Sequence, residues 1–160
     1  MRKNNFLFYR IYCMIAIFLF SGSLYYILEV IFKKTHSSHW SMFVLAGISS
    51  VLFIDGLNNL FSYDMDFLLQ IFLCSTAITI CELFVGLIVN TDYSIWNYTN
   101  MPLNYKGQIC LPFYFLWMFL SFIFIPFLDY IEWKIFKYKP DTPPYYKVFG
   151  RKIFSFKEKE

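Results

Sequence analysis

The stretch that decides the fold is FLLQIFLCSTAITICELFVGLIVN, residues 67–90, a predominantly apolar run that contains one acidic residue, Glu82. A helix needs about 20 consecutive apolar residues to cross the hydrocarbon core of a bilayer, and this run is long enough. Its apolar residues are continuous and do not alternate with polar ones, as they would in a strand of a membrane barrel. The stretch therefore predicts a transmembrane helix that carries a carboxyl group inside the membrane.

Further segments of the same character lie on both sides of this run, giving predicted helices at 11–32, 40–61, 67–90 and 111–136. The 160-residue chain is 58% hydrophobic and 24% aromatic, with a mean hydropathy of +0.48. A soluble domain of this size buries too little surface to hide so many apolar side chains. In lipid, only helices and closed barrels satisfy the backbone. The sequence therefore predicts an all-α integral membrane protein, a four-helix transmembrane bundle in contact with the lipid bilayer.

We expect the transmembrane domain to occupy residues 1–137 and a basic cytoplasmic tail to occupy residues 138–160. The tail includes KPDTPPYYKVFGRK, residues 139–152, which has three prolines and no helical period and is therefore expected to be extended. Basic residues gather near both termini: Arg2, Lys3, Arg10, Lys134, Lys137, Lys139, Arg151, Lys152, Lys157 and Lys159.

The distribution of these charges predicts the orientation of the bundle. Positive residues favour the cytoplasmic side, so we expect both termini to be cytoplasmic. Lys33 and Lys34 in the first outer loop oppose this assignment, but they are outnumbered by the charges near the termini. The high content of Phe, Ile, Tyr, Asn and Lys fits an AT-rich bacterial genome, so the expected location is the bacterial cytoplasmic membrane, as a multi-pass protein.

Glu82 belongs to a stripe of polar and small residues on the third predicted helix. Residues three and four apart share a helix face, which aligns Ser75, Thr79, Glu82, Gly86 and Asn90. Small residues let helices approach closely and polar residues bond between helices, so this stripe should face the other helices. An ionisable residue at this depth is a functional candidate by default, although a hydrogen-bonded glutamate that only fixes the helix register is the alternative.

The predicted topology distributes the other polar candidates between two sides of the membrane. Glu29, near the outer end of the first helix, and the polar residues of the loop 91–108 are expected to share one outward-facing cavity with Glu82 and Asn90. The substrate or proton site candidates are Glu82, Glu29, Asn90, Trp96, Tyr98, Asn104, Gln108, His39 and Thr79. The inner-side candidates are Asp55, Asn58 and Asp129.

Several classes of function find no signal in the sequence. The cysteines, at 13, 74, 81 and 110, show neither a CxxC motif nor zinc spacing, so we predict no metal, no cofactor and no disulfide. The basic residues are better explained by membrane topology than by nucleic-acid binding. The motifs H-E-x-x-H and G-x-S-x-G are absent, so an intramembrane enzyme, which two glutamates and a histidine could in principle form, is not the expected function.

The spacing of the polar residues resembles a known bacterial family. The most specific part is E-x-x-x-G-x-x-x-N at 82–90, then W-x-Y at 96–98 and N-x-x-G-Q-I-C-L at 104–111. Together with residues 37–59 and 127–136, this pattern resembles the family called Putative ABC-transporter type IV, or CmpB-like membrane proteins, over residues 37–149. The resemblance marks Ser38, His39, Trp40, Ser41, Met42, Gly47, Asn58, Thr79, Glu82, Gly86, Asn90, Trp96, Tyr98, Asn104, Gly107, Gln108, Trp117 and Asp129.

The chain departs from the family pattern at three places. It has Ala46-Gly47 where the family often has Gly-Gly, and Asn58-Asn59 where the family often has Asn-Glu. Asn97 stands where an aspartate is common, which removes a charge from the outer loop and puts a cation or proton role for that position in doubt.

The resemblance implies a permease-type component of a transporter. No G-x-x-x-x-G-K-[ST] phosphate loop occurs, so any ATPase would be a separate subunit. The predicted inner turn is too short for a coupling helix, so contact with an ATPase would use the C-terminal tail. Four helices rarely enclose a pathway alone, which implies a homo-oligomer or a membrane partner. The alternative is a non-transporting accessory or sensor protein that acts through helix–helix association; the sequence does not identify a substrate.

Overall fold

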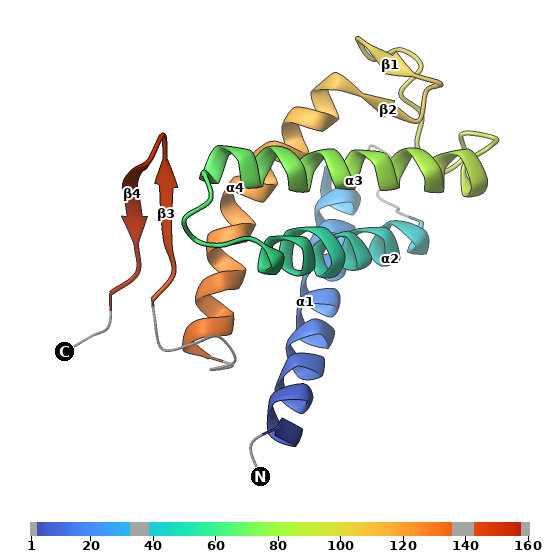
Figure 1. Ribbon diagram of the computed structural model, residues 1–160. Coiled ribbons are helices and arrows are strands. Elements are labelled where there is room, and N and C mark those ends of the chain that lie inside the picture. Colours follow the sequence, from blue (N-terminus) through green and yellow to red (C-terminus); the bar gives the residue numbers. More distant parts are fainter. Residues whose placement is uncertain (1–2, 33–38, 136–142, 158–160) are drawn as a thin grey trace.

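The fold is a bundle of long helices, seen here in a computed structural model that describes residues 3–32, 39–135 and 143–157. Within these residues, four helices are long and apolar enough to cross a membrane, which confirms the predicted all-α membrane architecture. Figure 1 shows α1 and α4 running steeply across the directions of α2 and α3. The helical elements are α1 (Lys3–Phe32), α2 (Trp40–Ser49), η1 (Ser50–Leu57), η2 (Asn58–Leu60), α3 (Phe67–Val89) and α4 (Leu111–Lys134).

Different segments of the chain lie at the two ends of the bundle. The start of α1, the turn between η2 and α3, and the end of α4 lie toward one end, whereas the loop between α3 and α4 lies at the other (Figure 1). We call these the terminal end and the loop end. The assignment of the terminal end to the cytoplasm stays a prediction. Several basic residues on which it depends fall outside the described residues: Arg2, Lys137, Lys139 and Lys159, and Lys33 and Lys34 of the first outer loop. Ser38 is also outside them.

Helix α1 begins eight residues earlier than predicted, at Lys3 instead of residue 11. Arg10 was predicted to precede the helix, and that prediction was wrong. The charged residue is tolerated inside the helix because its guanidinium has carboxylate partners on two other helices. Residues Leu7–Ile31 form the apolar span of this helix.

The second span is not a uniform α-helix. After Ser49 the backbone passes into a π-helical segment, Ser50–Leu57, and then into a short 3-10 turn. π-helical turns are wider than α-helical ones and are frequent at functional positions. Gly56 lies in this segment, where an added Cβ would come within 2.8 Å of the Val51 carbonyl oxygen. The segment presents Asp55, which is 2% exposed, to the interior of the bundle.

Helices α3 and α4 have clear terminal residues. Asp66 caps α3 by accepting a hydrogen bond from the Leu68 amide at 3.0 Å, as N-cap aspartates commonly do. Pro112 lies in the first turn of α4, where its missing N–H costs little. Between the two helices the chain forms a small antiparallel pair, β1 (Asn104–Tyr105) and β2 (Ile109–Cys110).

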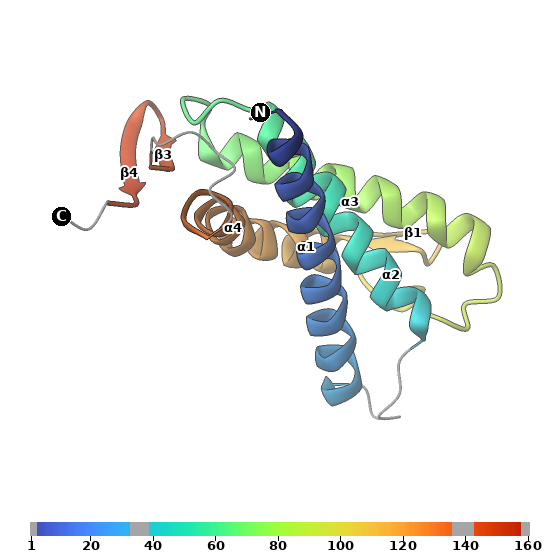
Figure 2. The same ribbon diagram turned by 90° about the horizontal axis from the view of Figure 1, so that it is seen from below.

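The described part of the C-terminal segment has extended backbone, as expected, and it folds back on itself as a hairpin that the sequence did not predict. β3 (Tyr145–Val148) and β4 (Arg151–Ser155) pair antiparallel. The hairpin lies beside α3 and α4 in both Figure 1 and Figure 2. Tyr146 is 1% exposed and its ring lies 4.7 Å from that of Phe67, which joins the hairpin to the core of the bundle.

The core of the bundle is built from aliphatic side chains of the spans: Ile17, Ile54, Ile71, Ile78, Ile125 and Leu128. Other large apolar side chains of the same helices point outward. Phe84 and Ile88 on α3, for example, are 61% and 76% exposed. A membrane around the helices would cover these side chains.

Candidate functional site

Glu82 lies inside the bundle with both carboxylate oxygens hydrogen-bonded. It is 3% exposed. Tyr98, from the loop between α3 and α4, donates its hydroxyl to Oε1 at 3.1 Å, and Trp117 on α4 donates Nε1 to Oε2 at 3.0 Å. Burial raises the pKa of Tyr98, and the carboxylate beside it raises that pKa further, so the phenol stays protonated and able to donate. Three separate segments therefore meet at one carboxyl group.

A cavity of about 80 Å³ adjoins Glu82 and is bordered by all four helical spans. Its lining is mostly apolar, and Tyr25 and Trp117 stack along it with ring centroids 6.1 Å apart. Ser21 also lines it; its hydroxyl is buried and has no hydrogen-bond partner within the described residues. Ser49 and Ser50 are further polar members of the lining. A cavity of this size can hold a small ligand or a few waters close to the carboxylate.

Asn90 and Gln108 form a hydrogen-bonded pair outside this cavity. Neither lines the cavity; instead they bond to each other, with Nδ2 of Asn90 donating to Oε1 of Gln108 at 3.0 Å. Gln108 returns a bond from Nε2 to the Asn90 carbonyl at 2.9 Å. Both side chains are almost fully buried. This reciprocal pair ties the end of α3 to the end of the loop.

The remaining loop candidates complete the same framework. Trp96 donates Nε1 to the Gln108 carbonyl at 3.0 Å, and its own carbonyl accepts from Asn90 at 2.7 Å. Asn104, which is exposed, bonds to the Thr99 and Met101 carbonyls and shapes the turn. Tyr98 alone among the loop candidates reaches Glu82. The loop is therefore ordered by its own hydrogen bonds and is folded back on the bundle through Tyr98.

Glycine is required where α3 meets this loop. A Cβ at Gly86 would lie 2.4 Å from Oε1 of Gln108, so no larger residue fits without moving the amide. Gly86 is the small member of the stripe seen in the sequence, and its role is to admit Gln108.

Three predicted candidates do not join the Glu82 site. Glu29 is half-buried on α1 and does not line the cavity. His39 is the N-cap of α2, where Nδ1 accepts from the Ser41 amide at 3.3 Å. Thr79 bonds back to the Ser75 carbonyl of its own helix at 2.9 Å. Glu29, Asn90 and Gln108 do not line this cavity, so one outward-facing cavity that they share with Glu82 stays a prediction.

The inner-side candidates form two connected groups at the terminal end. Asp129 on α4 accepts a hydrogen bond from the Tyr146 hydroxyl of the hairpin at 2.6 Å and from Asn58 at 3.4 Å. Asp55 accepts from Asn59 at 2.8 Å. All three predicted residues, Asp55, Asn58 and Asp129, are buried.

Sequence reasoning missed the cation that these acids surround. Arg10 on α1 places Nη2 2.9 Å from Oδ2 of Asp55 and donates Nη1 to Oε1 of Glu132 at 2.6 Å. Cys13 lies one turn further on, 3.7 Å from the same Glu132 oxygen. The signal that could have found this group is Asp55 itself, since a buried carboxylate requires a partner and Arg10 is the arginine nearest the predicted spans. Glu132 lies close to the end of the predicted helix, where charged residues are common, so its position did not indicate a buried ion pair.

The hairpin is attached to the turn before α3 by polar contacts. Lys147 pairs with Asp64, and Tyr145 donates its hydroxyl to the same oxygen at 2.9 Å. The hydrogen bond from Lys147 holds the pKa of Asp64 below its usual value, and Asp64 in turn raises the pKa of Lys147. Asp64 is exposed and Lys147 and Tyr145 are half-buried, so their contact orients the hairpin more than it stabilises the fold.

Comparison with known proteins gives a match to a family model. A family model described as Putative ABC-transporter type IV matches residues 6–148. Neither the curated proteins nor the solved structures contain a match. The matched region includes the four helical spans, the loop that reaches Glu82, and the first strand of the hairpin.

Proposed function

Since the chain belongs to the Putative ABC-transporter type IV family, we propose that it is a permease-type membrane component of a transport system, with its substrate or proton site at Glu82. The observation that carries the proposal is a buried carboxylate on the wall of a cavity that residues of all four spans line. Transport proteins commonly use intramembrane acids in helix-lined cavities in this way.

The geometry around Glu82 fits a site for a cation or a proton. An ionised carboxylate can accept about four hydrogen bonds. Tyr98 and Trp117 each supply one, which fixes the carboxyl group and leaves acceptor positions for a ligand in the cavity. The unpartnered hydroxyl of Ser21 is a further polar group that a ligand or water could meet.

The same contacts offer a way to couple occupancy to movement. Tyr98 belongs to the loop that covers the loop end of the bundle, and Trp117 belongs to α4. Protonation or cation binding at Glu82 would weaken its hold on both donors. We therefore propose that loading of Glu82 loosens the loop between α3 and α4, whose Tyr98 hydroxyl bonds to this carboxylate.

The proposal also requires an energy source and partner subunits. The sequence has no phosphate-binding loop, so we propose a separate ATPase subunit or a proton gradient as the energy source. We further propose that the chain works as a homo-oligomer or with a membrane partner, in the cytoplasmic membrane of a bacterium.

The alternative, an accessory or sensor protein that acts through its Gly-lined helix faces, has less support. A Cβ at Gly22 would lie 2.7 Å from the Phe43 carbonyl oxygen, and one at Gly47 would lie 2.6 Å from Cδ2 of Phe18. These two glycines are therefore used for packing of α1 against α2 within the chain, and a partner would have to bind elsewhere.

Proteoliposomes test the proposal. The chain is purified from native membranes in mild detergent with its co-purifying subunits, reconstituted, and assayed for proton flux with an internal pH-sensitive dye. We expect Glu82→Gln to abolish the flux, because the amide cannot carry a proton or hold a cation as the carboxylate does. Glu29→Gln is the matched control, since that glutamate lies on a span but outside the cavity, and it should retain the flux. Normal flux in Glu82→Gln would refute the site.

A further inference from the structure

The turn of the C-terminal hairpin contains a bulky residue in an unfavourable conformation. Phe149 has φ +48° and is followed by Gly150 at φ +75°. Two-residue hairpin turns of this kind favour Asn, Asp or Gly at the first position, because a large side chain is strained at positive φ. The Phe149 side chain is 85% exposed, so its ring contributes little packing that would offset the strain. Strain of this kind is a reason to look for a function of the side chain.

The hairpin is held firmly to the bundle, so the position of this ring is defined. The Phe149 amide donates to Oδ2 of Asp66 at 2.6 Å. Asp66 is the N-cap of α3, and the apolar span of α3 begins at the next residue, Phe67. Tyr146 fixes the base of the hairpin through its bond to Asp129. The turn is therefore fixed beside the point where an apolar span begins, which is the level of the membrane surface.

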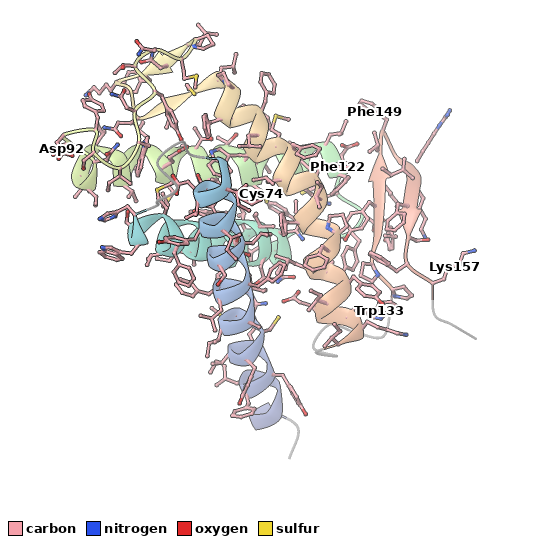
Figure 3. The ribbon with its side chains drawn as sticks, turned by 180° about the vertical axis from the view of Figure 1, so that it is seen from behind. Cys74, Asp92, Phe122, Trp133, Phe149 and Lys157 are labelled. Carbon is pink, nitrogen blue, oxygen red and sulfur yellow. The ribbon has the colours of Figure 1, made fainter. Side chains whose placement is uncertain are left out.

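The surface around the turn combines apolar and basic side chains. Ile153 and Phe154 on β4 are 55% and 48% exposed. Arg151, Lys152 and Lys157 are also exposed, and residues 143–157 contain no acidic residue. Figure 3 shows Phe149 at the tip of the hairpin and Lys157 beyond its opposite end, both on the outer side of the bundle. Aromatic rings and basic residues are the side chains that favour the membrane interface.

We propose that the hairpin is an interfacial anchor that binds the surface of an anionic lipid bilayer. The ring of Phe149 inserts at the boundary between headgroups and acyl chains, and Arg151, Lys152 and Lys157 bind the phosphates of anionic headgroups. Charge complementarity selects this partner, because each basic residue near an anionic membrane surface adds to the attraction. The proposal is independent of transport and of the role of Glu82.

Depth-dependent quenching tests where the tip of the hairpin lies. Phe149→Trp keeps a large aromatic ring and reports on its surroundings, with the wild-type signal from the native tryptophans subtracted. In nanodiscs with phosphatidylglycerol, we expect quenching of the added tryptophan by brominated lipid and protection from aqueous iodide. Arg151→Gln with Lys152→Gln in that background should reduce the lipid quenching. Quenching by iodide alone, as for a tip exposed to water or to a soluble partner, would overturn the proposal.

Hydrogen exchange distinguishes a membrane-anchoring role of Phe149 from a purely structural role in the turn. Phe149→Asn suits the positive φ better, so a purely structural role predicts equal or slower exchange of the hairpin amides. Anchoring predicts the opposite sign in anionic nanodiscs, with exchange faster by about tenfold, because the buried area of one aromatic ring is lost. Leu103→Asn is the matched control: Leu103 is also at positive φ (+50°) and is 78% exposed, but it lies in the other loop. It should leave hairpin exchange unchanged. Equal or slower exchange in Phe149→Asn would overturn the anchor.

Discussion

Removing the Arg10 guanidinium should destabilise the bundle strongly, because it leaves two buried carboxylates without their cation. Asp55 and Glu132 have side chains that are 1% and 0% exposed, and the Arg10 side chain is 17% exposed. Loss of one partner from a buried ion pair costs about 3–5 kcal/mol. Arg10→Met keeps most of the apolar length of the side chain, so the cost it measures is mainly electrostatic. We expect a loss of free energy of unfolding within that range.

The assay is equilibrium unfolding in mixed micelles, with helicity followed as the fraction of denaturing detergent rises. A triple variant, Arg10→Met with Asp55→Asn and Glu132→Gln, should recover most of the loss, because no unpaired charge remains. Arg151→Met is the matched control for loss of an exposed arginine and should change the free energy of unfolding by less than about 0.5 kcal/mol. A cost below about 1 kcal/mol for Arg10→Met alone would refute the reasoning, since the carboxylates would then not depend on the guanidinium.

Two further predictions concern the loop and the hairpin. Gly86→Ala should cost about 1–3 kcal/mol in the same assay by displacing Gln108, whose amide oxygen would lie 2.4 Å from the new Cβ; an unchanged midpoint would contradict it. The Asp64–Lys147 contact should persist at neutral pH and be lost as pH falls through the lowered pKa of Asp64, or as pH rises through the raised pKa of Lys147. Exchange of the hairpin amides against pH measures this, and Asp64→Asn should remove the acid transition.

The sequence predicted the spans well because lipid imposes a simple rule on length and apolarity. The predicted third helix, 67–90, differs from α3 by one residue, and the apolar run of residues sufficed to place it. The interior position of Glu82 also followed from helical periodicity. In both cases the information is local, so a single segment was enough to make the prediction.

The features that the sequence did not predict depend on contacts between residues far apart in the chain. Arg10 and Glu132 are 122 residues apart, and nothing within either segment indicates the other. The hairpin was missed because its turn, Phe149-Gly150, lacks the Asn or Asp that marks such turns in sequences. The hydrogen-bonded pair of Asn90 and Gln108 was not predicted, because it depends on the close approach of Gln108 to Gly86, which no single segment of the sequence indicates.

The long separation of Arg10 from Glu132 has a consequence for biogenesis. A chain is made from its N-terminus, so Arg10 and Asp55 enter the membrane before Glu132 exists, and Asp129 is made before Tyr146 can bond to it. Until then α1 and the second span hold a charged pair without its third member. The bundle therefore closes late, when α4 and the hairpin arrive. A nascent chain stalled before Glu132 should be a short-lived species and a natural target for membrane proteases and chaperones.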